Sequence, residues 1–265
     1  NSKVTAFEIN TIKHAYATLL KLFYNLQSLR LINESWLHQS MSNTDDVELY
    51  DLILNFAPLG LSLSSPVPDP ENYPQEFNRS TKTTEVYEQH KMLRHLKNSG
   101  NGYLLTGKYF SFSAKNVFKF VRNKLLKDQN IQTIFRLPGG LLSSTIIESL
   151  LFHLTKNDNQ EIQFVDTTEC FKKISRTELI LSQSGTDDIF NAINEGRKLE
   201  YRIEKIKAQS LISNVSDIDP NRFVDNSEAA QTRRRLLANY SDYDEVYLGS
   251  ESVSNSIKRY STVDD

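Results

Sequence analysis

The spacing of apolar residues along the chain predicts strands that alternate with helices. Residues 4–9 form an apolar run typical of a buried strand, and residues 11–24 repeat apolar positions at helical spacing. The same reasoning predicts further strands at 29–32, 49–54, 103–106, 131–137, 145–154 and 162–165, and further helices at 85–97 and 114–127. Strands separated by helices of this length predict an α/β fold with a doubly wound, mostly parallel sheet. The last two strands follow each other closely, which predicts an antiparallel edge strand.

The strand signal fades after about residue 170. Residues 187–207 and about 227–238 have helical spacing, and Asp219-Pro220 interrupts the pattern between them. We therefore predict an α/β domain over 1–170 and a helical C-terminal extension over 171–265. Four of the seven prolines fall within residues 61–80, which predicts a long loop of the kind that is usually functional or disordered.

Composition excludes several classes of protein. A net charge of -2 over 265 residues excludes a uniformly basic nucleic-acid coat, although a local basic face remains compatible with it. The single cysteine, Cys170, excludes a disulfide framework and predicts a reducing, cytoplasmic compartment. No apolar run approaches the roughly 20 residues that span a bilayer, so no membrane association is expected. No metal site is expected either, because no histidine has convincing ligand spacing to another ligand.

Three predicted strands end on, or contain, acidic side chains. Glu8 and Asn10 lie at the end of the first strand, Glu34 follows the second, and Asp51 lies in the strand that leads to Asn55. A carboxylate at the carboxyl end of a parallel strand can accept hydrogen bonds from both hydroxyls of a ribose. On spacing alone, each of these acids is either a ligand of such a kind or a solvated acid at a strand end.

Seven segments, taken in order, resemble the modification subunit of type I restriction–modification systems, a gamma-type DNA N6-adenine methyltransferase. The resemblance covers most of residues 4–225 and rests on segments 7–10, 32–35, 50–60, 100–106, 131–142, 164–168 and 219–223. It implies the Rossmann-like fold of class I methyltransferases, S-adenosylmethionine as cofactor, and double-stranded DNA as substrate. It also implies a specificity subunit and a restriction subunit as partners. By resemblance, Glu8 and Asn10 contact the cofactor ribose, Glu34 contacts its adenine, and Asp51 belongs to the same cofactor site.

The chain departs from this family at the cofactor loop. A Gly-rich turn before the first helix lets the backbone approach the methionine end of the cofactor. The first glycine here is Gly60, so no such turn lies upstream of Glu8. We therefore expect the domain to lack the family's first strand and its Gly-rich loop.

The chain also departs from the family at the catalytic motif, Asp-x-x-x-x-Asn-Pro-Pro-Phe/Tyr. The aligned residues are Phe56, Ala57, Pro58 and Leu59. Phenylalanine has no hydrogen-bond acceptor for the adenine amino group, so the backbone carbonyl of Ala57 is the acceptor that remains. Leu59 has no π-face for the flipped base, and such stacking is worth about 1–3 kcal/mol. Asn55 lies one position early, on the opposite side of the strand, and could substitute only across a bulge.

Three functions remain open at this stage. The first is a DNA adenine-N6 methyltransferase subunit that is weak or inactive, and the second is a non-catalytic scaffold on the same fold that binds DNA or a partner. The third is a nicotinamide-dependent oxidoreductase, which also fits Glu8 but leaves segment 131–142 without a purpose. Arg233, Arg234 and Arg235 lie on a predicted helix, where they either contact DNA phosphates or form a solvated face.

Overall fold

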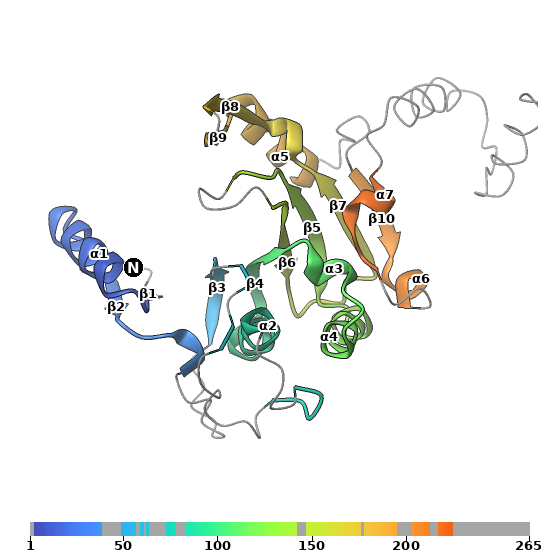
Figure 1. The fold of residues 1–265 in the computed structure, drawn as a ribbon, viewed down its shortest axis with the longest axis horizontal. Coiled ribbons are helices and arrows are strands. Elements are labelled where there is room, and N and C mark those ends of the chain that lie inside the picture. Colours follow the sequence, from blue (N-terminus) through green and yellow to red (C-terminus); the bar gives the residue numbers. More distant parts are fainter. Residues whose placement is uncertain are drawn as a thin grey trace, which may run out of the picture. The chain divides into compact units, whose positions relative to one another are not determined.

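A six-stranded mixed sheet, with strand order β10-β7-β5-β6-β4-β3, is the centre of the fold (Figure 1). The computed structural model describes residues 3–38, 49–56, 59–60, 62–63, 73–77, 83–141, 147–175, 178–194, 203–212 and 217–224. The strands of this sheet are β3 (Tyr50–Asn55), β4 (Leu96–Gly107), β5 (Ile131–Leu137), β6 (Ser149–Leu154), β7 (Glu161–Asp166) and β10 (Ile203–Lys207). This architecture confirms the predicted α/β fold.

Two strands of the sheet run against the other four. β6 pairs antiparallel with both β4 and β5, while β3 is parallel to β4 and β5 is parallel to β7. An antiparallel strand was expected at the edge, next to the strand at 162–165, but β6 lies inside the sheet and the antiparallel edge strand is β10. β5 pairs with β6 on one side and with β7 on the other, so β6 and β7 do not pair with each other.

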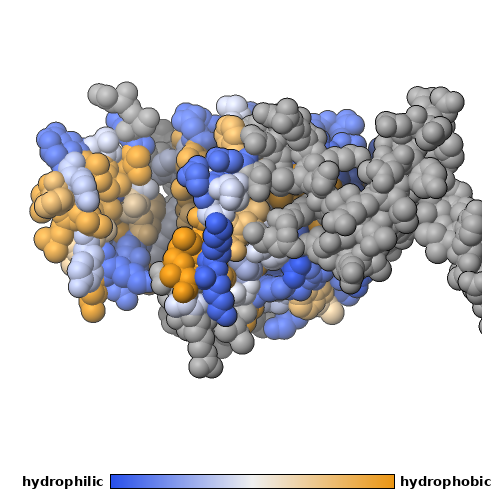
Figure 2. All heavy atoms as spheres, turned by 90° about the horizontal axis from the view of Figure 1, so that it is seen from above, coloured by the Kyte–Doolittle hydropathy of each residue, from blue (hydrophilic) through white to orange (hydrophobic). Residues whose placement is uncertain are grey.

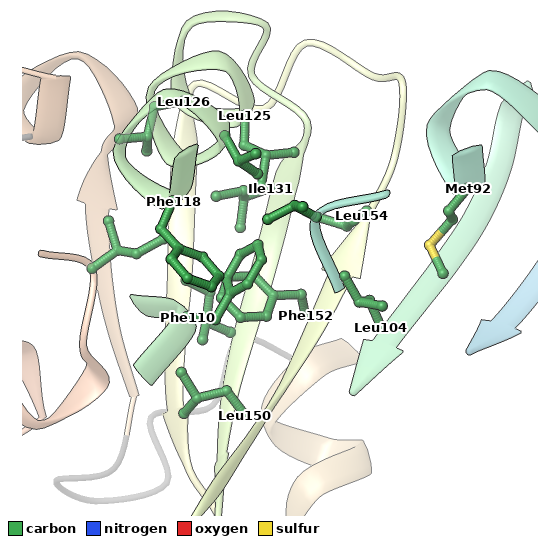
Figure 3. Packing of buried hydrophobic residues seen from close by; sticks show 14 of the residues in the cluster. Met92, Leu104, Phe110, Phe118, Leu125, Leu126, Ile131, Leu150, Phe152 and Leu154 are labelled. Atoms are coloured by element: carbon green, nitrogen blue, oxygen red, sulfur yellow. The ribbon is translucent and has the colours of Figure 1, made fainter. Parts of the chain in front are cut away.

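Helices on one face of the sheet enclose the main hydrophobic core. These helices are α2 (Thr84–His95), α3 (Tyr109–Phe112) and α4 (Asn116–Lys127). Figure 3 shows the rings of Phe110, Phe118 and Phe152 gathered between α3, α4 and the sheet. The rings of Phe110 and Phe152 have centroids 5.4 Å apart, and both side chains are fully buried. Burying one such side chain contributes about 1.5–3 kcal/mol, so this cluster stabilises the sheet and its helices as one unit.

The boundary between α2 and β4 differs from the prediction. The helix was expected to continue to Lys97 and the strand to begin at Tyr103, but α2 ends at His95 and β4 begins at Leu96. Residues 96–102 contain Asn, Ser and Gly, which are poor strand formers. Hydrogen bonding to β3 keeps them extended, across a register shift between Tyr50 and Leu52. Tertiary pairing therefore overrides the local preference.

The core extends beyond residue 170, where the sequence analysis ended the α/β domain. β8 (Phe171–Ser175) and β9 (Glu178–Leu181) form an antiparallel hairpin, and α5 (Gln183–Asn194) follows. The last five residues of the helix predicted at 187–207 are instead β10, because the open edge of β7 offers backbone partners to a segment with β-branched Ile203 and Ile206. α6 (Ala208–Ile212) and α7 (Pro220–Phe223) add buried residues to the core, namely Ala208, Leu211, Ile218 and Val224.

A separate βαβ unit precedes the sheet in sequence. β1 (Val4–Phe7) and β2 (Leu29–Ile32) pair in parallel, and α1 (Thr11–Phe23) connects them. The Asn10 side chain caps α1 by accepting hydrogen bonds from the amides of Ile12 and Lys13, each at 3.0 Å. No residue of α1 is buried, and large apolar side chains cover this unit in Figure 2. Those more than half exposed on α1 are Ile12, Tyr16, Leu19, Leu20, Leu22 and Phe23.

None of the helices formed by the described residues is long and apolar enough to cross a membrane.

Candidate functional site

The carboxyl ends of four strands meet at one edge of the six-stranded sheet. β3 ends at Asn55, β4 at Gly107, β5 at Leu137 and β7 at Asp166, and these four strands run in the same direction. Open α/β sheets bind their ligands outside this edge. We define the motif loop as residues 56–60, of which the structure describes Phe56, Leu59 and Gly60; Phe56 directly follows β3 at this edge.

The last residue of β3, Asn55, and the first residue of the motif loop, Phe56, differ in their exposure to solvent. Asn55 is 9% exposed, whereas the Phe56 side chain is 59% exposed. Ala57 and Pro58 lie outside the described residues, and Leu59 is half-buried. The aromatic ring at the start of the loop is therefore open to solvent, while the one amide side chain nearby is turned into the protein.

Two buried glutamates on α2 contact Gly60, the last residue of the motif loop, and Asn55, the residue before the loop. The Glu85 Oε1 atom accepts a hydrogen bond from the Gly60 amide at 2.9 Å and another from the Tyr109 hydroxyl. Glu88 lies one helical turn later, and its carboxylate accepts a hydrogen bond from the Asn55 side chain. The sequence analysis missed both residues. Acids in the first turns of a helix are common for electrostatic reasons, and nothing in their spacing distinguishes a buried pair from a solvated one.

Burial changes the proton affinity of this cluster. Burial of the Glu88 carboxyl, together with the nearby charge of Glu85, raises its pKa from 4.5 to about 8, although the bond from Asn55 opposes the shift. Burial likewise raises the pKa of the Tyr109 hydroxyl, and the adjacent Glu85 adds to this effect. The Glu88 carboxyl therefore keeps its proton at neutral pH far more than an exposed carboxyl does.

Tyr109 reaches Glu85 because of a glycine at the end of β4. A Cβ atom added to Gly107 would lie 2.3 Å from the Tyr109 ring atom Cε1, which is a severe clash. The absence of a side chain at Gly107 thus lets the ring lie against the strand. Such a close approach is a common reason for glycine at a strand end.

An ion-pair network covers the other half of the same edge. The Arg136 guanidinium binds Asp166 at 2.9 Å and Glu148 at 2.7 Å, and Lys108 binds the second Glu148 oxygen at 2.9 Å. Burial alone would raise the pKa of Glu148, but the hydrogen bonds from Arg136 and Lys108 outweigh it and lower that pKa. Lys108 also lies 3.8 Å from Asp219, so the network connects β4, β5 and β7 with the residue that caps α7.

The residues predicted to bind the cofactor separate into two groups. Glu8 and Glu34 follow the paired ends of β1 and β2, where Phe7 is opposite Ile32. The Glu8 amide donates to the Ile32 carbonyl at 3.0 Å, and the Asn33 side chain donates to the Glu8 carbonyl at 2.8 Å. The structure therefore brings Glu8 and Glu34 to neighbouring strand ends. Asn10 lies beside Glu8, but its side-chain oxygen is used to cap α1.

Asp51 lies at the amino end of β3, not at the carboxyl edge. Its side chain is 80% exposed and forms an ion pair with Lys97 at 2.9 Å. Because parallel α/β sheets bind ligands at the opposite end of their strands, this position argues against the predicted contact between Asp51 and a cofactor.

Two further predictions fall partly or wholly outside the described residues. Arg233, Arg234 and Arg235 lie outside them. Of the predicted loop at 61–80, the structure describes residues 62–63 and 73–77. Tyr73 and Phe77 are buried, and both rings lie against Tyr87 of α2, with centroids 5.0 and 5.3 Å away. The described part of this loop therefore packs on the helix that carries Glu85 and Glu88.

Comparison with known proteins decides the family. Residues 33–233 match N-6 DNA methylases. The chain belongs to the N-6 DNA methylase family. This match spans more than three quarters of the chain, including the motif loop, the two buried glutamates and the ion-pair network, and it confirms the resemblance seen in the sequence.

Solved structures agree with the fold. The methyltransferase subunit of a type I restriction–modification system from Streptococcus thermophilus superposes with a TM-score of 0.70 at 19% identity, covering 83% of this chain and 48% of that protein. The M protein of the type I restriction enzyme EcoKI gives 0.57 at 12% identity, covering 89% of this chain and 59% of that protein. The chain therefore spans about half the length of these two proteins.

Proposed function

We propose that this chain is part of a DNA adenine-N6 methyltransferase subunit of a restriction–modification system, and that it contains the site for the adenine that accepts the methyl group. We propose that its own methyltransferase activity is weak or absent. The observation that carries the proposal is the motif loop, which leaves the carboxyl end of β3 at the ligand edge of the sheet. Membership in the N-6 DNA methylase family supports adenine as the acceptor. Double-stranded DNA and a specificity subunit are the partners proposed for this function, and a restriction subunit is a further partner within such a system.

The cofactor in this proposal is S-adenosylmethionine, which supplies the methyl group when bound. The described residues at the ends of β1 and β2 provide part of a binding site for S-adenosylmethionine. Glu8 and Glu34 place two carboxylates at neighbouring parallel strand ends, which suits ribose hydroxyls and an adenine amino group. The Glu8 Oε1 atom already accepts the Asn10 amide at 2.7 Å, which orients the carboxylate and leaves Oε2 for a sugar hydroxyl.

Weak activity follows from the side chains of the motif loop. Phe56 stands where the family has the asparagine that accepts a hydrogen bond from the adenine amino group, and a phenyl ring cannot accept one. Asn55 does not replace it in this arrangement, because its side chain is buried and donates to Glu88. The same observation favours a second function, a non-catalytic scaffold on this fold that binds DNA or a partner subunit.

Calorimetric titration of the full chain with S-adenosylmethionine, S-adenosylhomocysteine and NAD tests the cofactor. We expect saturable heat with the first two compounds and none with NAD. Glu8→Gln should weaken binding by about tenfold, the loss of one hydrogen bond to a charged group, and Asp51→Asn should leave it unchanged. Binding of NAD alone, or of none of the three compounds, contradicts the proposal.

A further inference from the structure

One exposed arginine, Arg222, is joined to the carboxyl edge of the sheet by direct contacts. Lys108 directly follows β4 at this edge, and its Nζ atom lies 3.8 Å from an Asp219 carboxylate oxygen. The Asp219 carbonyl accepts a hydrogen bond from the Arg222 amide at 2.9 Å, within the short helix α7. Arg222 therefore lies beside the edge where open α/β sheets bind their ligands. The proposed function assigns no role to this segment.

The backbone that carries Arg222 is anchored to the core before and after this residue. Ile218 is buried, and its amide donates to the Ser111 carbonyl at 3.0 Å. The ring of Phe223 lies 4.5 Å from the ring of the fully buried Phe164 on β7, measured between centroids. The position of Arg222 is therefore fixed by packing on the sheet, unlike that of an arginine in a loop without such contacts.

A largely buried aspartate fixes one side of the Arg222 guanidinium. The Arg222 Nε atom lies 2.7 Å from Asp217 Oδ2, and Asp217 Oδ1 accepts the Asp219 amide at 2.8 Å. The Asp217 side chain is 10% exposed, whereas that of Arg222 is 65% exposed. The Arg222 side chain pairs with no other residue that the structure describes. The outer part of the guanidinium is thus open to a ligand, and its planar donors suit two oxygens of one phosphate.

Arg222 is the exposed positive end of a network that is neutral as a whole. Burial lowers the pKa of the Arg122 guanidinium and the nearby charge of Asp217 opposes this shift, so Arg122 also belongs to the network. The four cations are Lys108, Arg122, Arg136 and Arg222, and the four acids are Glu148, Asp166, Asp217 and Asp219. Every other member has a side chain that is at most 30% exposed. A polyanion therefore meets a positive pole here and no net negative charge.

We propose that Arg222 binds a backbone phosphate of duplex DNA whose adenine lies at the carboxyl edge of the sheet, and that Asp217 is the positioning residue that holds the guanidinium toward it. The choice of DNA rests on the proposed function. Stability alone does not explain the arrangement, because an exposed ion pair contributes only about 0–1 kcal/mol. Phosphate contacts of this kind set the register and orientation of a protein on the duplex and read no sequence.

Fluorescence anisotropy of a labelled, adenine-containing duplex, titrated with the full chain at several salt concentrations and without cofactor, tests this site. Arg222→Gln should weaken binding on the order of tenfold, the loss of a hydrogen bond between charged groups. The slope of log K against log salt should fall in magnitude by about 0.9, which corresponds to one phosphate contact. Arg222→Lys keeps the charge but not the planar fork, so the slope should match that of the unaltered chain while the affinity falls.

Lys97→Gln is the matched control, since Lys97 is also exposed and paired with an aspartate, Asp51, but at the amino ends of β4 and β3. It should change neither affinity nor slope. All three variants should unfold at the urea concentration that unfolds the unaltered chain, because each substitution is at an exposed side chain.

Equal slopes for the unaltered and Arg222→Gln proteins would overturn the inference, as would the same loss of slope in Lys97→Gln or in Arg222→Lys. A lower urea midpoint for Arg222→Gln would also overturn it, by giving Arg222 a structural role. Absence of duplex binding by the unaltered chain would overturn this site and the DNA substrate of the proposed function together. Loss confined to Arg222→Gln separates the two, since the cofactor titration does not depend on this residue.

Discussion

Replacing Glu88 with glutamine should remove a pH dependence of stability. The folded protein binds the Glu88 proton more tightly than the unfolded chain does, since burial raises the pKa of this carboxyl from 4.5 to about 8. The stabilising contribution of the proton is therefore complete below pH 4.5 and is lost as the pH rises through about 8. Over this window the free energy of unfolding of the unaltered protein should fall as the pH rises.

The magnitude follows from the size of the shift. Each unit of pKa difference corresponds to about 1.4 kcal/mol. Between about pH 5 and about pH 8 the effect is therefore on the order of 4 kcal/mol, a large share of the roughly 5–15 kcal/mol that stabilises an ordinary domain. Glutamine resembles the protonated acid in shape and does not titrate. The Glu88→Gln protein should thus match the unaltered one near pH 5 and exceed its stability near pH 8.

Urea unfolding at several pH values, followed by the fluorescence of the single tryptophan, Trp36, measures this difference. Trp36 is a suitable probe because its ring lies 5.9 Å from that of His95, on the same helix as Glu88. His153, whose burial lowers its pKa to about 4, contributes equally to both proteins and cancels in the difference. Glu34→Gln, at an exposed position, is the control and should change nothing. Parallel pH profiles for the unaltered and Glu88→Gln proteins would refute the reasoning.

Three further substitutions test the packing around the site by chemical denaturation. Phe152→Ala should destabilise the protein by about 3–5 kcal/mol, because the ring is fully buried in the core; a loss under 1 kcal/mol would mean the ring is not packed as described. Arg136→Met leaves the fully buried Asp166 carboxylate without its cation and should cost about 3 kcal/mol, and adding Asp166→Asn should recover part of that loss. Gly107→Ala should cost about 1–3 kcal/mol by displacing the Tyr109 ring, and a neutral result would show that the ring is free to move.

The sequence was sufficient to predict the elements whose apolar spacing agrees with their final environment. The strands at 131–137 and 29–32, and the helix at 114–127, match the structure to within about two residues. The helix expected at 187–207 was wrong at residues 203–207, since the three-residue spacing of Ile203 and Ile206 is helical but the open edge of β7 pairs with this segment as a strand. The local spacing of apolar residues does not show which edge of the sheet is open for pairing, so the strand at 203–207 could not be predicted from the sequence.

Candidate site residues at the ends of strands could be predicted from the sequence, whereas those on helix α2 could not. The neighbouring ends of β1 and β2, which carry Glu8 and Glu34, could be predicted because adjacent parallel strands end side by side. The single sheet edge expected for these ends and the end of β3 is not seen, since β1 and β2 form a sheet separate from that of β3. Glu85 and Glu88 could not be found in the same way, since their importance comes from burial against Asn55, Gly60 and Tyr109. A carboxyl group on a helix is assumed to be solvated until its neighbours are known.

Transfer of a labelled methyl group from S-adenosylmethionine to adenine in duplex DNA tests the central claim most directly. The unaltered chain should transfer little or none, and the triple variant Phe56→Asn, Ala57→Pro, Leu59→Phe should transfer at least about tenfold faster, because it regains an acceptor for the amino group and a ring for stacking. The double variant Phe56→Asn, Leu59→Phe separates the side-chain contributions from that of the added proline. A rate for the unaltered chain equal to that of the triple variant would contradict the account, as would the absence of any gain on restoring the motif.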